Sequence, residues 1–68
     1  MIVPIYVYNQ LVKLRELEKQ LRRLGWRVSR EGGKHTIWTD GVNEIAVPRH
    51  KEVNEYTARK ILKLAKGD

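Results

Sequence analysis

The chain has 68 residues, enough for one small domain, and it carries 14 Lys and Arg against 8 Asp and Glu, a formal net charge of +6. It contains no cysteine, which excludes disulfides and thiolate metal sites and favours a reduced, cytoplasmic setting. Such a positive field favours phosphate-rich partners, nucleic acid first among them, and a merely soluble basic surface is the alternative.

The first eight residues, MIVPIYVY, are apolar but have no basic leader and no small-residue cleavage site. Pro4 interrupts them well short of the roughly 20 residues needed to span a bilayer, so we expect neither a signal peptide nor a membrane anchor. Residues 1–8 are interpreted as an edge strand or as an N-terminal extension lying on a partner or on the domain. The extension is favoured because Pro4 cannot donate to a strand ladder.

Leucines recur three or four residues apart between Asn9 and Leu24, the spacing that lines one face of a helix. The stripe comprises Leu11, Leu14, Leu17, Leu21 and Leu24. We predict Asn9 as the N-cap and Gly25 as the left-handed end of this helix. Most Lys and Arg of the segment fall outside the stripe, so the leucines are expected to pack inward while the cations face water.

From Trp26 onward, alternating residues predict three antiparallel strands. Glycine-containing turns at 32–33 and 40–41 separate the strands, which comprise 26–30 (WRVSR), 35–39 (HTIWT) and 44–47 (EIAV). In the first strand, Trp26, Val28 and Arg30 are expected to share one side. The third strand is expected to stop at Pro48, where a polar loop begins.

A second amphipathic helix is predicted within NEYTARKILKLAKGD, marked by the apolar residues Ala58, Ile61, Leu62 and Ala65. Asn54 or Thr57 caps it, and Gly67 ends it. The order helix, three strands, helix predicts an α+β two-layer sandwich, in which two helices cover one face of a three-stranded antiparallel sheet. We expect residues 1–68 to form a single domain.

The ordered motifs from Leu14 to Gly67 resemble those of the HicA-type toxins. They are LRRLGWRVSR, then GGKH, a hairpin, VPRH, and TARKILKLA as the closing helix. The resemblance implies a double-stranded-RNA-binding-domain-like fold (α-β-β-β-α), mRNA interferase activity restrained by a HicB-type antitoxin, and a catalytic role for His35. Two features depart from the pattern: Lys34 stands where serine or aspartate is more usual, and the segment before Leu14 is longer.

RNA cleavage of this kind needs proton transfer. The ribose 2′-OH attacks the neighbouring phosphorus, so one proton must be removed, another must reach the leaving 5′-oxygen, and charge on the phosphate must be stabilised. Imidazole, with an ordinary pKa of about 6.5, suits both proton steps near neutrality. Arg30 and Lys34 are the candidate residues for binding the phosphate. The alternative for His35 is a turn-flanking residue whose ring hydrogen-bonds to backbone.

Strand alternation bears on whether His35 is accessible. His35 and Ile37 share one face of the second strand and Trp38 lies on the other. We predict that Trp38 faces the helices together with Trp26, which leaves His35 on the more open face. If Ile37 faces the core instead, Trp38 is an exposed ring on which a base can stack.

The two histidines do not make a zinc site, because there is no cysteine and no paired spacing such as His-Glu-x-x-His. We therefore expect no metal and no cofactor. His50 follows Pro48 and Arg49 and is predicted to be a solvent-exposed loop residue, with a second proton-transfer group or a phosphate contact as the alternatives.

The leading hypothesis is a toxin ribonuclease whose partners are mRNA and an antitoxin. A non-catalytic RNA-binding module of the same fold is the second hypothesis, and it predicts salt-sensitive binding without cleavage. The third is a basic domain that binds an acidic protein.

Overall fold

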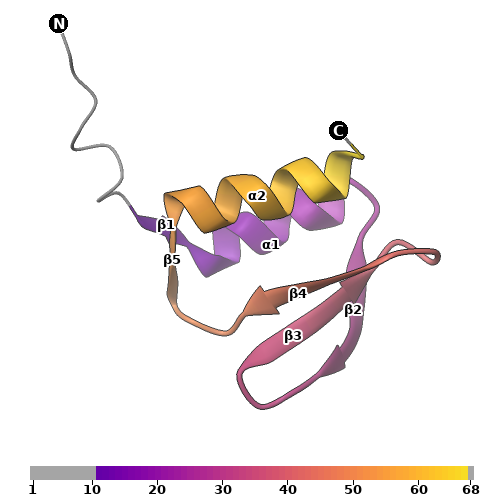
Figure 1. Cartoon of the computed structure of the whole chain (residues 1–68), viewed down its shortest axis with the longest axis horizontal. Helices are drawn as coiled ribbons and strands as arrows, with labels where there is room; N and C mark the ends of the chain where they lie inside the picture. The colour runs from indigo at the N-terminus through magenta and orange to yellow at the C-terminus, as the bar shows by residue number, and fades with distance from the viewer. Residues whose placement is uncertain (1–10, 68) are drawn as a thin grey trace, which may run out of the picture.

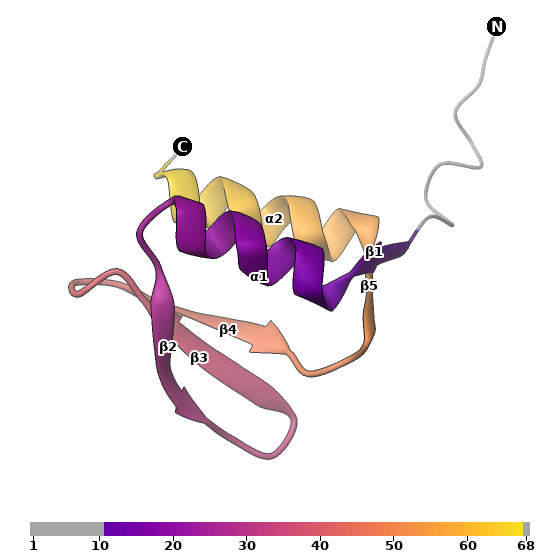
Figure 2. The same ribbon diagram turned by 180° about the vertical axis from the view of Figure 1, so that it is seen from behind.

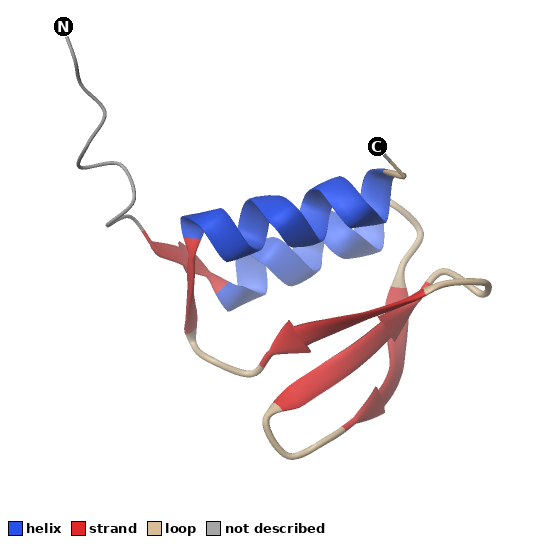
Figure 3. Ribbon diagram, in the orientation of Figure 1, coloured by secondary structure: helices blue, strands red, loops and turns tan. Residues whose placement is uncertain are grey.

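Two helices pack on one face of a three-stranded antiparallel sheet in the computed structural model, which describes residues 11–67 (Figures 1 and 3). The elements in chain order are β1 (Leu11–Lys13), α1 (Leu14–Arg23), β2 (Arg27–Glu31), β3 (His35–Thr39), β4 (Glu44–Pro48), β5 (Glu52–Asn54) and α2 (Glu55–Lys66). The sheet has the order β2-β3-β4, and β1 pairs with β5 separately. The predicted α+β class and its central α-β-β-β-α order are confirmed. The predicted extension, residues 1–8, lies outside the described residues.

The core lies between the helices and the sheet. The two helices run side by side in the same direction, as both views show (Figures 1 and 2). The largest fully buried side chains come from both layers: Leu17 and Leu21 from α1, and Trp38 and Val47 from the sheet. The indole nitrogen of Trp26 donates a hydrogen bond of 3.0 Å to the carbonyl oxygen of Ala65, which ties the end of α2 to the start of β2. Neither helix in the described part of the chain has the length and apolar character needed to cross a membrane.

The helix α1 begins at Leu14, several residues after the predicted N-cap, Asn9. Residues 11–13 are extended instead, because β1 pairs antiparallel with β5 near the other end of the chain. The amide of Leu14 also donates to the carbonyl of Lys51 at 2.8 Å. The N-cap is Lys13, without a side-chain cap, so the predicted Asn9 cap was wrong. The leucine spacing continues the helical period back to Leu11, but the pairing of β1 with β5 makes this segment extended. Gly25, with φ +92°, ends the helix as predicted.

An irregularity in β2 changes which of its side chains share a face. Val28 lies opposite Trp38, whereas Arg30 lies opposite Ile37. Residues directly opposite each other share a face, so Val28 is on the helix-facing side and Arg30 on the open side. The expectation that Val28 and Arg30 share a side was wrong. The bulge adds one residue, Ser29, to β2, so Arg30 faces the opposite side from the one that regular alternation predicts.

The segment after Pro48 is more ordered than the predicted polar loop. It contains β5, which runs directly into α2. The side-chain oxygen of Asn54 accepts a hydrogen bond of 2.8 Å from the amide of Tyr56, so Asn54, not Thr57, caps the helix. Gly67 adopts a left-handed conformation with φ +83° and ends α2 as predicted.

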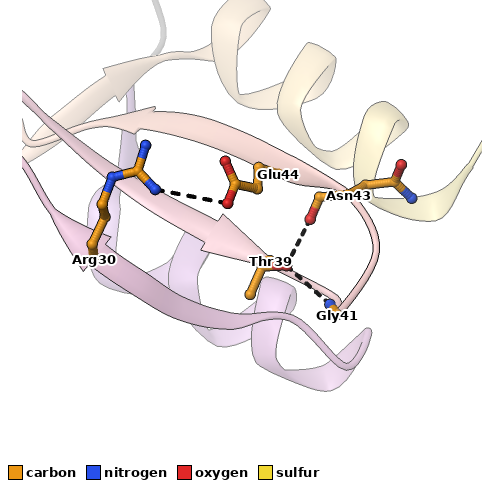
Figure 4. Close-up of polar contacts among 5 residues, drawn as sticks. All are labelled: Arg30, Thr39, Gly41, Asn43 and Glu44. Atoms are coloured by element: carbon orange, nitrogen blue, oxygen red, sulfur yellow. Dashed lines mark hydrogen bonds and ion pairs between the residues drawn. The ribbon is translucent and has the colours of Figure 1, made fainter.

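Side-chain hydrogen bonds fix the turn between β3 and β4 (Figure 4). The Thr39 hydroxyl donates to the Asn43 carbonyl at 2.8 Å and accepts from the Gly41 amide at 2.9 Å. The Asp40 carboxylate accepts from the amides of Asn43 and Val42, and these two bonds lower the pKa of Asp40. Their contribution to stability is therefore present above the ordinary carboxyl pKa and is lost as the pH falls through the lowered value.

Candidate active site

His35 begins β3 and is exposed on the open face of the sheet. Its backbone oxygen accepts a hydrogen bond of 2.8 Å from the amide of Gly32, which closes the tight turn formed by Gly33 and Lys34. A Cβ atom at Gly32 would lie 3.1 Å from that same oxygen, so any other residue there would require a small local shift. Trp38 is fully buried against the helices, which confirms the predicted open position of His35.

A groove between β4 and α2 opens beside His35, with a volume of about 430 Å³. β4 is an outer strand of the sheet and packs beside α2, so the groove follows a sheet edge (Figure 1). Pro48 lies opposite His35 in the register of β3 and β4, and both residues line the groove. On the other side, α2 contributes Tyr56 and Lys60. The volume is within the range of about 300–1,000 Å³ typical of ligand sites.

Arg30 shares the open face with His35 and forms an ion pair with Glu44, which also lines the groove. Its Nη1 lies 3.7 Å from Oε2 of Glu44, which stands opposite Thr39 at the far end of β3 from His35 (Figure 4). Both side chains are more than half exposed, and an exposed pair of this kind contributes only about 0–1 kcal/mol. A phosphate group can therefore compete with Glu44 for the Arg30 guanidinium.

Lys34 lies in the turn that precedes His35, and its side chain is exposed. The Lys34 carbonyl accepts a hydrogen bond of 3.0 Å from the amide of Arg49, which continues the ladder between β3 and β4. Lys34 forms part of the turn and Arg30 pairs with Glu44, so the two predicted cations lie at different positions relative to His35.

Arg49 is a residue of this site that the sequence analysis did not single out. Its Nη1 donates a hydrogen bond of 2.7 Å to the carbonyl of Gly32, and its Nη2 lies 3.9 Å from Oε1 of Glu31. Its amide also donates to the Lys34 carbonyl. Arg49, which directly follows β4, therefore contacts both sides of the turn that precedes His35. The VPRH motif was the available signal, but nothing in it indicates that the Arg49 side chain reaches back to the glycine turn.

Tyr56 was not proposed as a site residue either. Tyr56 is 67% exposed, and the Lys60 ammonium lies 5.6 Å from the centre of its ring. The sequence signal was an aromatic residue in the first turn of an N-capped helix, outside the apolar stripe that contains Ala58 and Ile61.

His50 is exposed and follows the end of β4, which confirms its predicted exposure. In residues 11–67, no group of three or more His, Cys, Asp or Glu side chains is placed to hold a metal ion.

A family profile described as the HicA toxin of bacterial toxin–antitoxin systems matches residues 14–66. The chain belongs to the HicA toxin family. The match covers α1, the three-stranded sheet and α2, so the turn that carries His35 and the neighbouring groove lie within the HicA region. Membership of this family assigns the protein a toxin role and implies an antitoxin partner. Searches of curated proteins and of solved structures found no significant match to the chain.

Proposed function

We propose that this HicA toxin is a metal-independent mRNA endoribonuclease and that His35 carries out proton transfer. The observation that supports this most directly is an exposed imidazole, held by a hydrogen-bonded glycine turn, at the side of a groove in a chain of net charge +6. Its partners are mRNA as substrate and a HicB-type antitoxin as inhibitor, and an mRNA substrate places its action in the cytoplasm.

In the reaction, the neutral His35 imidazole accepts the proton of a ribose 2′-OH. The 2′-oxygen forms a bond to the adjacent phosphorus, and the bond from phosphorus to the 5′-oxygen breaks. The imidazolium then returns the proton to the departing 5′-oxygen, so the histidine is regenerated. The products are a 2′,3′-cyclic phosphate and a 5′-hydroxyl, and the ribose itself supplies the nucleophile.

Arg30 and Lys34 bind phosphates of the RNA strand in this proposal. Each is exposed, and they lie on different elements, Arg30 in β2 and Lys34 in the turn before His35, so they suit phosphates that flank the scissile one. Arg30 can present two donors to phosphate oxygens once it leaves Glu44.

Two measurements test this proposal: the chemical ends of the cleavage products and the requirement for a metal ion. Purified toxin incubated with RNA in excess EDTA is expected to release fragments ending in 2′,3′-cyclic phosphate, detected by mass spectrometry. An RNA with deoxyribose on the 5′ side of each cleavage position should resist, because it has no nucleophile there. Cleavage that requires added Mg²⁺, or that survives this replacement, would contradict the mechanism. Salt-sensitive binding without any product would favour the RNA-binding module instead.

Arg49→Ala is expected to lower the cleavage rate by about tenfold, with little change in the KM for RNA. The reason is that loss of the bond to Gly32 lets the turn move His35, and a misplacement of about 1 Å can reduce a rate by up to about 10²-fold. Single-turnover kinetics measure the rate, and amide hydrogen exchange at Gly32 measures the loosening of the turn.

Arg59→Ala is the matched control for this variant. Arg59 also pairs with a glutamate, Glu55, at 3.4 Å, but both residues belong to α2 and not to the turn of His35. Equal rate losses in the two variants would show that general loss of positive charge, and not the Arg49 contact, controls the rate.

A further inference from the structure

Tyr56 presents an aromatic ring that the fold does not use in its core. The buried residues of α2 are Ala58 and Ile61, whereas Tyr56 keeps 67% of its surface exposed. Its backbone is nevertheless held firmly, because its amide bonds to the Asn54 side chain and β5 leads directly into the helix. An exposed ring on a fixed helix turn offers apolar surface with little conformational freedom left to lose on binding.

The ring lines the same groove as His35. Pro48 lies opposite His35 in the strand register, and Tyr56 lies on the α2 side of the groove that Pro48 also lines. A ligand that occupies the groove therefore contacts Tyr56 and reaches the start of β3, where the imidazole lies.

Lys60 places a cation over the ring of Tyr56. Its ammonium is 5.6 Å from the ring centre of Tyr56, and it lines the groove as well. An aromatic platform next to a cation matches a nucleotide, whose base offers a flat face and whose phosphate offers negative charge. Bases in a duplex are already stacked on one another, so only a single strand can offer a free base to the ring.

We infer that Tyr56 is a stacking subsite for a base of single-stranded RNA and that Lys60 contacts the adjoining phosphate. This inference rests on the proposed function for its biological meaning, since it specifies the substrate as single-stranded at the groove. The physical interaction is separate from the cleavage chemistry and is measured without it.

The test uses a short fluorescent oligoribonucleotide whose 2′-hydroxyls are replaced by fluorine, so that the proposed cleavage cannot occur. Fluorescence anisotropy with the full-length toxin gives its Kd. Tyr56→Ala is expected to raise the Kd by at least about fivefold, the lower end of the effect of removing one base–aromatic stack. Tyr56→Trp should retain or improve binding. Lys60→Gln should reduce the slope of log Kd against log salt by about 0.7, as expected when one phosphate contact to a single strand is lost.

Two controls make the result specific. Tyr56→Leu keeps an apolar side chain without a π face and should bind as weakly as Tyr56→Ala. Affinity for a duplex of the same sequence should change less than twofold in Tyr56→Ala. A Kd within twofold of wild type for Tyr56→Ala with the single strand, or full binding by Tyr56→Leu, would overturn the inference. If Tyr56 contributes to binding but the wild-type toxin never cleaves RNA, the stacking subsite is retained and the proposed nuclease activity is rejected.

Discussion

Replacing His35 by alanine is expected to lower the rate of RNA cleavage by about 10² to 10⁴-fold, the usual contribution of positioned acid–base catalysis. The side chain is exposed and the hydrogen bond that closes its turn uses the backbone oxygen, so the fold should be unaffected. Single-turnover cleavage of labelled RNA measures the rate. Circular dichroism and thermal melting of the same preparation should match the wild type.

His50→Ala is the matched histidine control. His50 is exposed as well, but it follows the end of β4 instead of standing at the start of β3. We expect His50→Ala to retain most of the activity, so that the loss is specific to His35. Undiminished cleavage by a carefully purified His35→Ala variant would remove His35 from the mechanism and leave the family assignment and the fold untouched.

Replacing Trp38 by alanine is expected to reduce the free energy of unfolding by about 3–5 kcal/mol, as for other large buried aromatic residues. Trp38 is fully buried at the centre of the sheet, and the guanidinium of Arg22 lies 5.1 Å from the centre of its ring. Small domains lie toward the lower end of the usual range of about 5–15 kcal/mol, so the variant should keep at most about 2 kcal/mol of stability and unfold at a much lower urea concentration. Urea unfolding followed by circular dichroism measures the change.

Trp38→Phe separates packing from polarity at this position. The indole nitrogen of Trp38 is buried without a hydrogen-bond partner among the described residues, so Phe removes a polar group that gains nothing from burial. It also keeps an aromatic ring in the core. We expect a clearly smaller loss of stability than for alanine. An equal loss in both variants would mean that the full indole volume, and not the presence of a ring, holds the two layers together.

The fold was largely predictable because its strongest signals are local. The leucines of α1 and the apolar residues of α2 repeat at the helical period, and Gly25 and Gly67 end the helices where expected. The prediction that Trp38 is buried was also confirmed. Errors arose where distant segments meet. The pairing of β1 with β5 turned the predicted start of a helix into a strand.

The candidate site was predictable only in part. His35 and its glycine turn can be recognised from adjacent residues, and the structure places the ring on the open face as expected. Arg30 was assigned to the wrong side of its strand relative to Val28, because a bulge in β2 has no clear signature in the residues RVSRE. Its pairing with Glu44 depends on the register of β2 and β4 with β3.

Local patterns were enough to assign the fold class and the C-terminal ends of both helices, because these follow from periodicity and turn chemistry within a few residues. They also placed His35 directly after a glycine turn. The surroundings of His35, in contrast, depend on tertiary contacts. The groove with Tyr56 forms because α2 packs beside β4, and the Arg49 contact to Gly32 forms because the end of β4 meets the hairpin. Both depend on contacts between residues far apart in the chain, which local patterns do not encode.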